Sequence, residues 1–312
     1  MNTNNTANPI DMSVDFCGIT LKNPVCTASG TCGYGREYLP FYAPEDLGAI
    51  TVKALTIAPR AGNPTPRIAE TPSGILNAIG LQNPGVEYFL EHELPWLVER
   101  NATIIANVAG ATLEDYIAAA ELLDNSAVHM LELNISCPNV KEGGVAFGVK
   151  PESVEKITRE VKAHVKNKPL IIKLSPNVAD IRENAKAAEA GGADALSLIN
   201  TLLGMKLNTK TRKPILANVT GGLSGPAVFP VALRMVWQVA GVTQLPILGR
   251  GGVATADDAA AMMIAGATAI QIGTANFRDP YAAIKVIDGL ERFADSIGLS
   301  SVTELTGTLE EW

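Results

Sequence analysis

Eight short apolar runs recur along the chain, each separated from the next by a longer stretch, and this alternation limits the fold more than any other feature. Within each run the hydrophobic residues are nearly continuous, with few polar residues between them. That pattern is typical of strands covered on both faces, as in parallel sheets with crossover helices. The runs occupy residues 23–30, 49–56, 103–110, 130–137, 169–176, 195–201, 245–252 and 269–276.

Amphipathic helical patterns fill stretches between these runs, at residues 113–125, 151–165, 179–193 and 255–267. Thr112 with Asp115, and Thr255 with Asp258, have the spacing of a capping box with Asp in place of the usual Glu. The sequence therefore predicts an α/β fold, a single (β/α)8 TIM barrel with inserted βα loops. A doubly wound open sheet is the alternative, and periodicity alone does not exclude it.

The chain length of 312 residues suits one barrel of about 250 residues with modest insertions, so we expect a single domain over residues 1–312. Residues 1–22 are expected to form an N-terminal extension before the first barrel strand. Two connections, at 57–83 and 202–224, are too long to be simple linkers. We expect both to form walls of a site.

Charge and cysteine spacing exclude several classes of protein. The formal net charge of −7 argues against a nucleic-acid-binding protein, because phosphate contacts need clustered Lys and Arg. No apolar run reaches the roughly 18 residues that span a bilayer, and no signal-peptide pattern opens the chain, so we expect a cytoplasmic protein. Cys17, Cys26, Cys32 and Cys137 lack the C-x-x-C spacing of zinc or iron–sulfur sites, so we expect no metal on this chain.

Polar residues or glycines close every predicted strand. In a β/α barrel the C-terminal ends of the strands meet on the face that carries the catalytic groups. A single lysine at a strand end commonly marks only a solvated strand tip. Because all eight predicted strands end in polar residues or glycines, that interpretation is weakened. The residues are Ser29, Lys53, Asn107, Asn134 with Cys137, Lys173, Asn200 with Thr201, Gly251 with Gly252, and Gly273 with Thr274.

Glycine-rich pieces surround the last three predicted strands, at 220–225, 249–252 and 272–274. Glycine lets backbone N–H groups approach phosphate oxygens closely, and a following helix N-terminus adds a favourable dipole. One such piece alone is more often a tight structural turn. Three on adjacent strands predict a site for a phosphate-bearing cofactor or substrate.

The stretch 133–148, LNISCPNVKEGGVAFG, is the most informative part of the sequence. Asn134, Cys137 and Asn139 bring two amides and one thiol close together after the fourth predicted strand. Cysteine is most often a buried apolar residue, and that is the alternative here. Pro138 and the polar neighbours of Cys137 are poor surroundings for a core thiol, so the pattern favours a site.

At these residues the sequence resembles the dihydroorotate dehydrogenases, specifically the NAD-linked branch that works with a separate electron-transfer subunit. The resemblance covers nearly the whole chain, and its most branch-specific part runs from residue 199 to residue 227. Members of the family are FMN-binding β/α barrels, which agrees with the phosphate site predicted from the glycines. The matching pieces are ASGT (28–31), NAIGLQNPG (77–85), NISCPN (134–139), KLSPN (173–177), INTLLGMKL (199–207) and KPILANVTGGLSGPA (213–227).

The resemblance implies oxidation of dihydroorotate to orotate in de novo pyrimidine (UMP) biosynthesis, with hydride transfer to FMN and Cys137 as the general base. Cys137 and Lys53 are then the catalytic residues. The implied substrate-binding residues are Lys53, Asn77, Gly80, Leu81, Asn134, Asn139, Asn200 and Thr201. The implied FMN-binding residues are Ser29, Gly30, Lys53, Ala54, Asn107, Asn134, Lys173, Ile199, Ser224, Gly225, Gly251, Gly252, Gly273 and Thr274.

Electrons taken from the substrate must leave the flavin, and the sequence has no G-x-G-x-x-G fingerprint after a strand for binding NAD itself. The resemblance implies a partner subunit that carries FAD and a [2Fe–2S] cluster and passes the electrons to NAD. It also implies a homodimer of this chain flanked by two such partners, which together make a heterotetramer.

Two other functions stay open at this point. One is a catalytic module of the dihydropyrimidine dehydrogenase type, which shares the cysteine and asparagines but acts on uracil or thymine. The other is a flavin-binding subunit that only relays electrons, with Cys137 incidental.

Three residues depart from the family pattern without removing a catalytic group. Cys26 and Cys32 stand where an apolar and an aromatic residue are expected, and Arg250 stands in a glycine turn where an apolar residue is usual.

Overall fold

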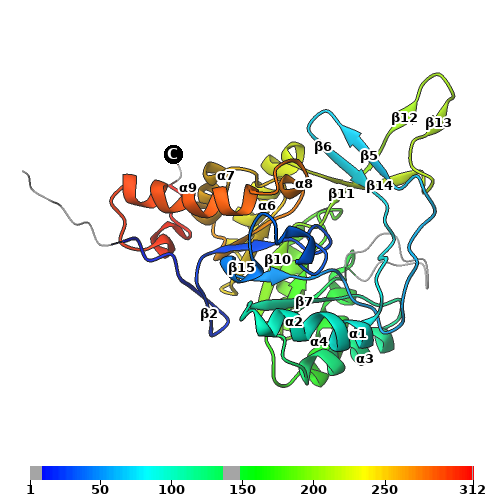
Figure 1. Cartoon of the computed structure of the whole chain (residues 1–312), viewed down its shortest axis with the longest axis horizontal. Helices are drawn as coiled ribbons and strands as arrows, with labels where there is room; N and C mark the ends of the chain where they lie inside the picture. The colour runs from blue at the N-terminus through cyan, green and yellow to red at the C-terminus, as the bar shows by residue number, and fades with distance from the viewer. Residues whose placement is uncertain (1–8, 136–147, 311) are drawn as a thin grey trace, which may run out of the picture.

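Eight parallel strands form a sheet that closes on itself in the computed structural model, which describes residues 9–135, 148–310 and 312 (Figure 1). The strand order is β3–β16–β15–β10–β9–β8–β7–β4, and a parallel bridge between Cys26 and Ala49 joins the two ends. The strands are β3 (Val25–Thr27), β4 (Ile50–Thr51), β7 (Ile104–Val108), β8 (Met130–Leu133), β9 (Leu170–Lys173), β10 (Ala195–Leu198), β15 (Ile247–Arg250) and β16 (Ala269–Ile272). Each lies within one of the eight apolar runs, so the predicted TIM barrel is confirmed and an open doubly wound sheet is excluded.

Helices follow the barrel strands, as the sequence predicts. At the start of α3, the Thr112 hydroxyl accepts a hydrogen bond from the Asp115 N–H at 3.2 Å, and the Asp115 carboxylate accepts one from the Thr112 N–H. Thr255 and Asp258 form the same capping box before α7, so both predicted boxes are confirmed. The helices are α1 (Val86–Tyr88), a π-helical turn η3 (Phe89–Glu93), α2 (Leu94–Glu99), α3 (Leu113–Asp124), α4 (Pro151–His164), α5 (Ile181–Ala190), α6 (Phe229–Ala240), α7 (Ala256–Ile264), α8 (Ala275–Arg278) and α9 (Ala282–Ser296), with 3-10 turns η1 (Arg36–Tyr38), η2 (Pro44–Asp46), η4 (Pro226–Val228) and η5 (Val302–Leu305).

The core lies between the barrel and its helices. Ile105, Leu131 and Ile172 are completely buried, because these strands are covered on both sides. Cys26 and Cys32 belong to the same apolar core, so they act as small hydrophobic residues in positions where the family pattern has apolar and aromatic ones. Within the described part of the chain, every helix is too short or too polar to cross a membrane.

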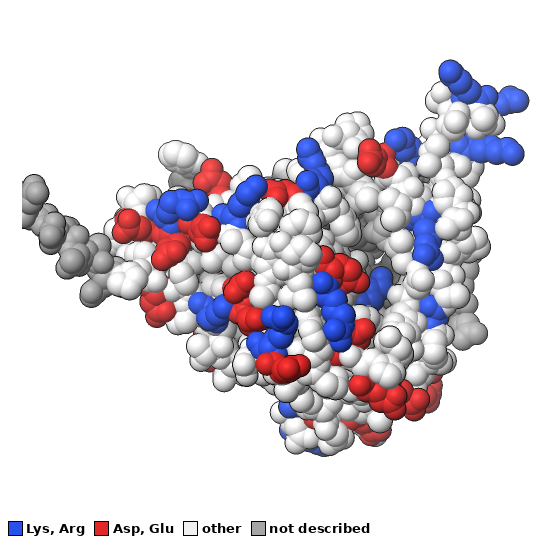
Figure 2. Space-filling model, in the orientation of Figure 1, with Lys and Arg blue, Asp and Glu red and all other residues white. Residues whose placement is uncertain are grey.

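The two long insertions meet above the barrel. They contribute β5 (Ile68–Thr71), β6 (Gly74–Asn77), β11 (Leu202–Met205) and β14 (Thr220–Ser224), which form an antiparallel sheet in the order β11–β14–β6–β5. A hairpin of β12 (Leu207–Asn208) and β13 (Lys213–Pro214) projects beyond this sheet (Figure 1), and basic side chains gather at its tip (Figure 2). At the other end of the chain, β1 (Val14–Phe16) and β2 (Ile19–Leu21) form a hairpin before the first barrel strand.

Candidate functional site

A cavity of about 360 Å³ opens at the C-terminal ends of the barrel strands, beneath the sheet made by the two insertions. Residues of both insertions line it, among them Ile68 and Ile75 from the first and Leu223 from the second. The prediction that these insertions form walls of a site is therefore confirmed. The volume falls in the range of about 300–1,000 Å³ that is usual for small-molecule sites.

Most of the residues predicted for the site lie on the wall of this cavity. They are Ser29, Gly30, Lys53, Ala54, Asn77, Gly80, Leu81, Asn134, Lys173, Ile199, Asn200, Thr201, Ser224, Gly251, Gly252, Gly273 and Thr274. Asn107 is completely buried beneath the wall, and Gly225 lies directly after Ser224. Cys137 and Asn139 fall outside the described residues. The individual roles of all these residues stay predictions.

Amide side chains face one part of the cavity. The Asn200 side-chain amide donates to the Asn134 side-chain oxygen at 3.4 Å, and the Asn134 carbonyl accepts from the Tyr116 hydroxyl at 2.8 Å. Asn77, on β6 of the insertion sheet, also lines the cavity and donates to the Gly222 carbonyl on β14 at 3.4 Å. Because an amide offers both a donor and an acceptor, this wall can match the alternating N–H and C=O groups of a pyrimidine ring.

Glycines and hydroxyls form another part of the wall. Gly225 and Gly252 have φ values of 102° and 84°, which non-glycine residues rarely adopt. A Cβ added to Gly252 would lie 2.7 Å from the Gly225 carbonyl oxygen, so the two turns pack too closely for any side chain. Beside them the Thr274 hydroxyl donates to the Ser224 hydroxyl at 2.8 Å. Glycine turns and paired hydroxyls of this kind suit a phosphate group.

Two lysines bring positive charge to the cavity. Lys53 lies after β4, and Lys173 ends β9. Lys173 is only 5% exposed, and its ammonium donates to the Ser29 hydroxyl at 2.9 Å. An acidic chain thus presents local positive charge in its pocket, which favours an anionic ligand.

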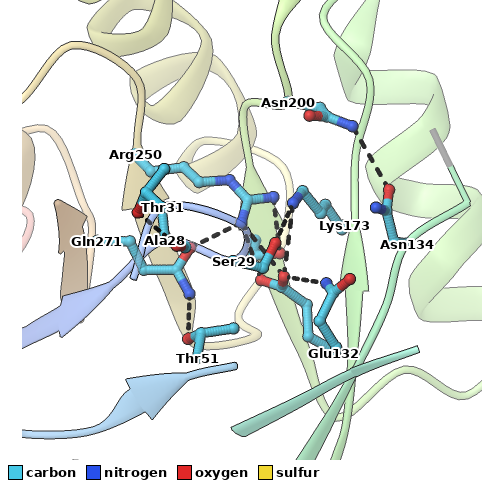
Figure 3. Close-up of polar contacts among 12 residues, drawn as sticks. Ala28, Ser29, Thr31, Thr51, Glu132, Asn134, Lys173, Asn200, Arg250 and Gln271 are labelled. Atoms are coloured by element: carbon cyan, nitrogen blue, oxygen red, sulfur yellow. Dashed lines mark hydrogen bonds and ion pairs between the residues drawn. The ribbon is translucent and has the colours of Figure 1, made fainter. Parts of the chain in front are cut away.

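A buried polar network extends from the floor of the cavity into the barrel (Figure 3). Arg250 on β15 contacts both carboxylate oxygens of Glu132 on β8, at 3.0 and 3.3 Å, and donates to the Gln271 side-chain oxygen at 2.7 Å. Asn107 also donates to Glu132, at 2.6 Å, and Gln271 donates onward to the Thr51 hydroxyl at 2.7 Å. The network joins opposite sides of the barrel interior, which apolar side chains usually fill.

Glu132 and Gln271 are not among the residues predicted for the site, and Arg250 appears only as a departure from the family pattern. A signal was present in the sequence. Each of the three interrupts an otherwise apolar strand, and a strand buried on both faces has no solvated side for such a residue. A buried charge needs a partner, so the sequence indicates that Glu132 and Arg250 each have one, without indicating which.

The electrostatics of Glu132 give a prediction for acid stability. Burial raises its pKa, but Arg250 and Lys173 outweigh burial and lower that pKa to about 2. A carboxyl whose pKa is lowered in the folded state stabilises the fold at pH values above its ordinary pKa. This contribution is lost as the pH falls toward 2. We expect the free energy of unfolding to fall by on the order of 3 kcal/mol between pH 5 and pH 2 on account of Glu132.

Denaturant unfolding across this pH range measures the loss. The matched control is the double variant Glu132→Gln with Arg250→Met, which keeps the other carboxyls but lacks this one. If the free energy of unfolding fell equally with pH in the wild-type protein and the double variant, Glu132 would not be the cause of the loss.

Three of the four cysteines are unsuited to act as a base. Burial raises the pKa values of Cys26 and Cys32 to about 12, and burial together with Asp194 does the same for Cys17. All three are therefore neutral thiols near pH 7. In the described ranges, no group of three or more His, Cys, Asp or Glu side chains is arranged to hold a metal ion.

The family model described as "Dihydroorotate dehydrogenase" matches residues 11–294. Among curated relatives, the chain is 56% identical to "Dihydroorotate dehydrogenase B (NAD(+)), catalytic subunit" of Alkaliphilus oremlandii, over 96% of this chain and 99% of that protein. Proteins with the same name from Listeria monocytogenes serotype 4a and Anoxybacillus flavithermus are 56% and 54% identical, over 94% and 95% of this chain and 97% and 95% of theirs.

A solved structure, the "DHODH in complex with ferulenol from Eimeria tenella", is similar with a TM-score of 0.82 at 23% identity, over 99% of this chain and 91% of that one. At that identity the likeness supports the barrel fold alone.

Proposed function

The chain belongs to the dihydroorotate dehydrogenase family, and from that premise we propose how it oxidises dihydroorotate to orotate in pyrimidine biosynthesis. The oxidation uses FMN held in the barrel cavity, Cys137 as general base, and a partner subunit as the route for electrons. The observation that carries this proposal is the cavity itself. It combines an amide wall for the substrate, a glycine wall for a phosphate, and Lys53 and Lys173 for negative charge.

The residues present fit FMN. Gly251, Gly252 and Gly273 line the cavity without side chains, so a phosphate can approach their backbone closely. Beneath the cavity, the side-chain oxygen of Asn107 is buried and has no hydrogen-bond partner among the described residues, so it can accept a hydrogen bond from a bound ring N–H. Ser29, Lys173, Ser224 and Thr274 would hold the rest of the cofactor.

The chain's own residues bind and orient the substrate. Asn77, Asn134, Asn139 and Asn200 hydrogen-bond the pyrimidine ring, and Thr201 lies beside them. Lys53 supplies positive charge to the substrate carboxylate. Cys137 as thiolate takes the proton from C5. Bound FMN would supply the hydride acceptor for C6, and Lys173 would stabilise the negative charge that develops there.

Electrons leave through a second subunit. The curated relatives are named catalytic subunits of NAD-linked enzymes, which supports a partner for this chain as well. We propose that the partner carries FAD and a [2Fe–2S] cluster and reduces NAD. The assembly is a cytoplasmic heterotetramer in which two copies of this chain are flanked by two partners.

Anaerobic mixing of the purified flavoprotein with dihydroorotate is expected to bleach the flavin absorbance near its long-wavelength maximum, because the oxidised ring loses its conjugation on accepting a hydride. Dihydrouracil lacks the carboxylate that Lys53 would bind, so it is expected to reduce the flavin far more slowly. Stopped-flow absorbance compares the two substrates directly.

Three outcomes separate the alternatives. Bleaching by dihydroorotate alone supports the proposal. Bleaching by dihydrouracil at a similar rate would favour a dihydropyrimidine dehydrogenase module, and bleaching by neither would favour an electron-relay subunit.

A further inference from the structure

Two buried cations share one buried carboxylate below the cavity. Arg250 lies 3.0 Å from one oxygen of Glu132, and the Lys173 ammonium lies 3.7 Å from the other. Glu132 is completely buried, while Arg250 and Lys173 are 4% and 5% exposed. Two positive charges and one negative charge leave this cluster with a net charge of +1.

The excess charge faces the cavity. Both Arg250 and Lys173 line it, whereas Glu132 lies beneath them (Figure 3). Among the described lining residues, Lys53 is a third cation and none is Asp or Glu. The other partners of the Arg250 side chain, Gln271, Ser197 and the Ile199 carbonyl, are neutral. Because Arg250 and Lys173 are buried, this charge is less screened than a charge on the surface.

We propose that Arg250 is a positioning residue that raises the reduction potential of the bound flavin by preventing Glu132 from neutralising Lys173. The inference rests on the proposed function, since it requires FMN in this cavity. Without Arg250, Glu132 and Lys173 would form a neutral pair. With it, the cluster keeps one positive charge next to the site where electrons arrive.

The redox step explains why this charge matters. Dihydroorotate loses a hydride from C6, which carries two electrons and one proton, and a second proton from C5, which goes to the base. The C5–C6 bond becomes a double bond, and transfer of the hydride leaves the flavin with one additional negative charge. A fixed positive charge nearby therefore stabilises the reduced form over the oxidised form.

The position of the Arg250 side chain is fixed by further contacts. Its Nε donates to the Ile199 carbonyl at 3.1 Å, and its own carbonyl accepts from the Ile199 N–H at 2.9 Å. Gln271, which accepts from the guanidinium, is itself held by Thr51. A charge held this firmly need not reorganise when the flavin is reduced, so it acts at full strength.

The test measures the two-electron reduction potential of FMN in purified, loaded protein by spectroelectrochemistry at pH 8. Arg250→Met is expected to favour the oxidised flavin about tenfold, a fall of roughly 30 mV. Arg250→Lys keeps the charge and is expected to stay near the wild-type potential. The double variant Arg250→Met with Glu132→Gln also keeps a net charge of +1 and is expected to recover the wild-type value.

The double variant separates charge from structure, because it lacks every contact of the guanidinium and yet carries the wild-type net charge. A potential in Arg250→Met equal to that of the wild type would overturn the inference. So would a double variant whose potential stays as low as that of Arg250→Met. If the wild-type protein binds FMN and dihydroorotate bleaches the flavin, either of these two results refutes only this inference. A wild-type protein that binds no FMN would refute the proposed function.

Discussion

Replacing Cys137 by alanine is expected to slow flavin reduction by dihydroorotate at least about a hundredfold, the usual contribution of a general base. Alanine removes the only group proposed to take the C5 proton while leaving the amide wall and the flavin site unchanged. Anaerobic stopped-flow reduction measures this step without the partner subunit. Cys17→Ala is the matched control, because Cys17 contacts the Asp194 carbonyl outside the cavity, and its rate is expected to stay at the wild-type value.

The pH profile supplies a second readout of the same base. A free thiol has an ordinary pKa of about 8.5, so the thiolate fraction grows from pH 6 toward pH 9. The rate of flavin reduction is expected to rise over that range in the wild-type protein and to be flat in Cys137→Ala. A wild-type profile that is already flat would count against a thiol base.

Much of the fold was predictable because it depends on local patterns. A strand covered on both faces must be apolar throughout, so runs such as 103–110 and 169–176 mark barrel strands without reference to any partner. The capping boxes at Thr112 and Thr255 depend on residues only three apart. Closure of the barrel was a weaker prediction, because it depends on pairing between β3 and β4, which a strand pattern does not specify.

The cavity wall was predictable for a different reason. Parallel strands end on the same face, so Asn134 and Asn200 are brought together by topology although they are far apart in sequence. The antiparallel sheet formed by the two insertions was not predicted, since β6 and β14 are short and contain glycine. Nor was the pairing of Arg250 with Glu132, because the choice of a buried partner depends on the width of the barrel interior.

Glu132→Gln is expected to lower the free energy of unfolding by about 3–5 kcal/mol, the usual cost of leaving buried charge unpaired. The change removes the only carboxylate between Arg250 and Lys173 among the described contacts of this cluster. Two buried cations then repel each other in a medium of low dielectric constant. Denaturant unfolding of the protein measures the loss. The control is Asp180→Asn, which removes the charge of an exposed ion pair with Arg182 while keeping an N-cap side chain, and it is expected to change stability far less.

Adding Arg250→Met to Glu132→Gln is expected to restore most of this stability. The second change removes one of the two buried cations that would otherwise repel each other, and an apolar side chain of similar length can fill a buried position at little cost. If the double variant were less stable than Glu132→Gln alone, the hydrogen bonds of Arg250 to Ile199 and Gln271 would outweigh its charge in holding the barrel together. Recovery would instead mean that Glu132 stabilises the fold mainly by balancing the buried charge of Arg250.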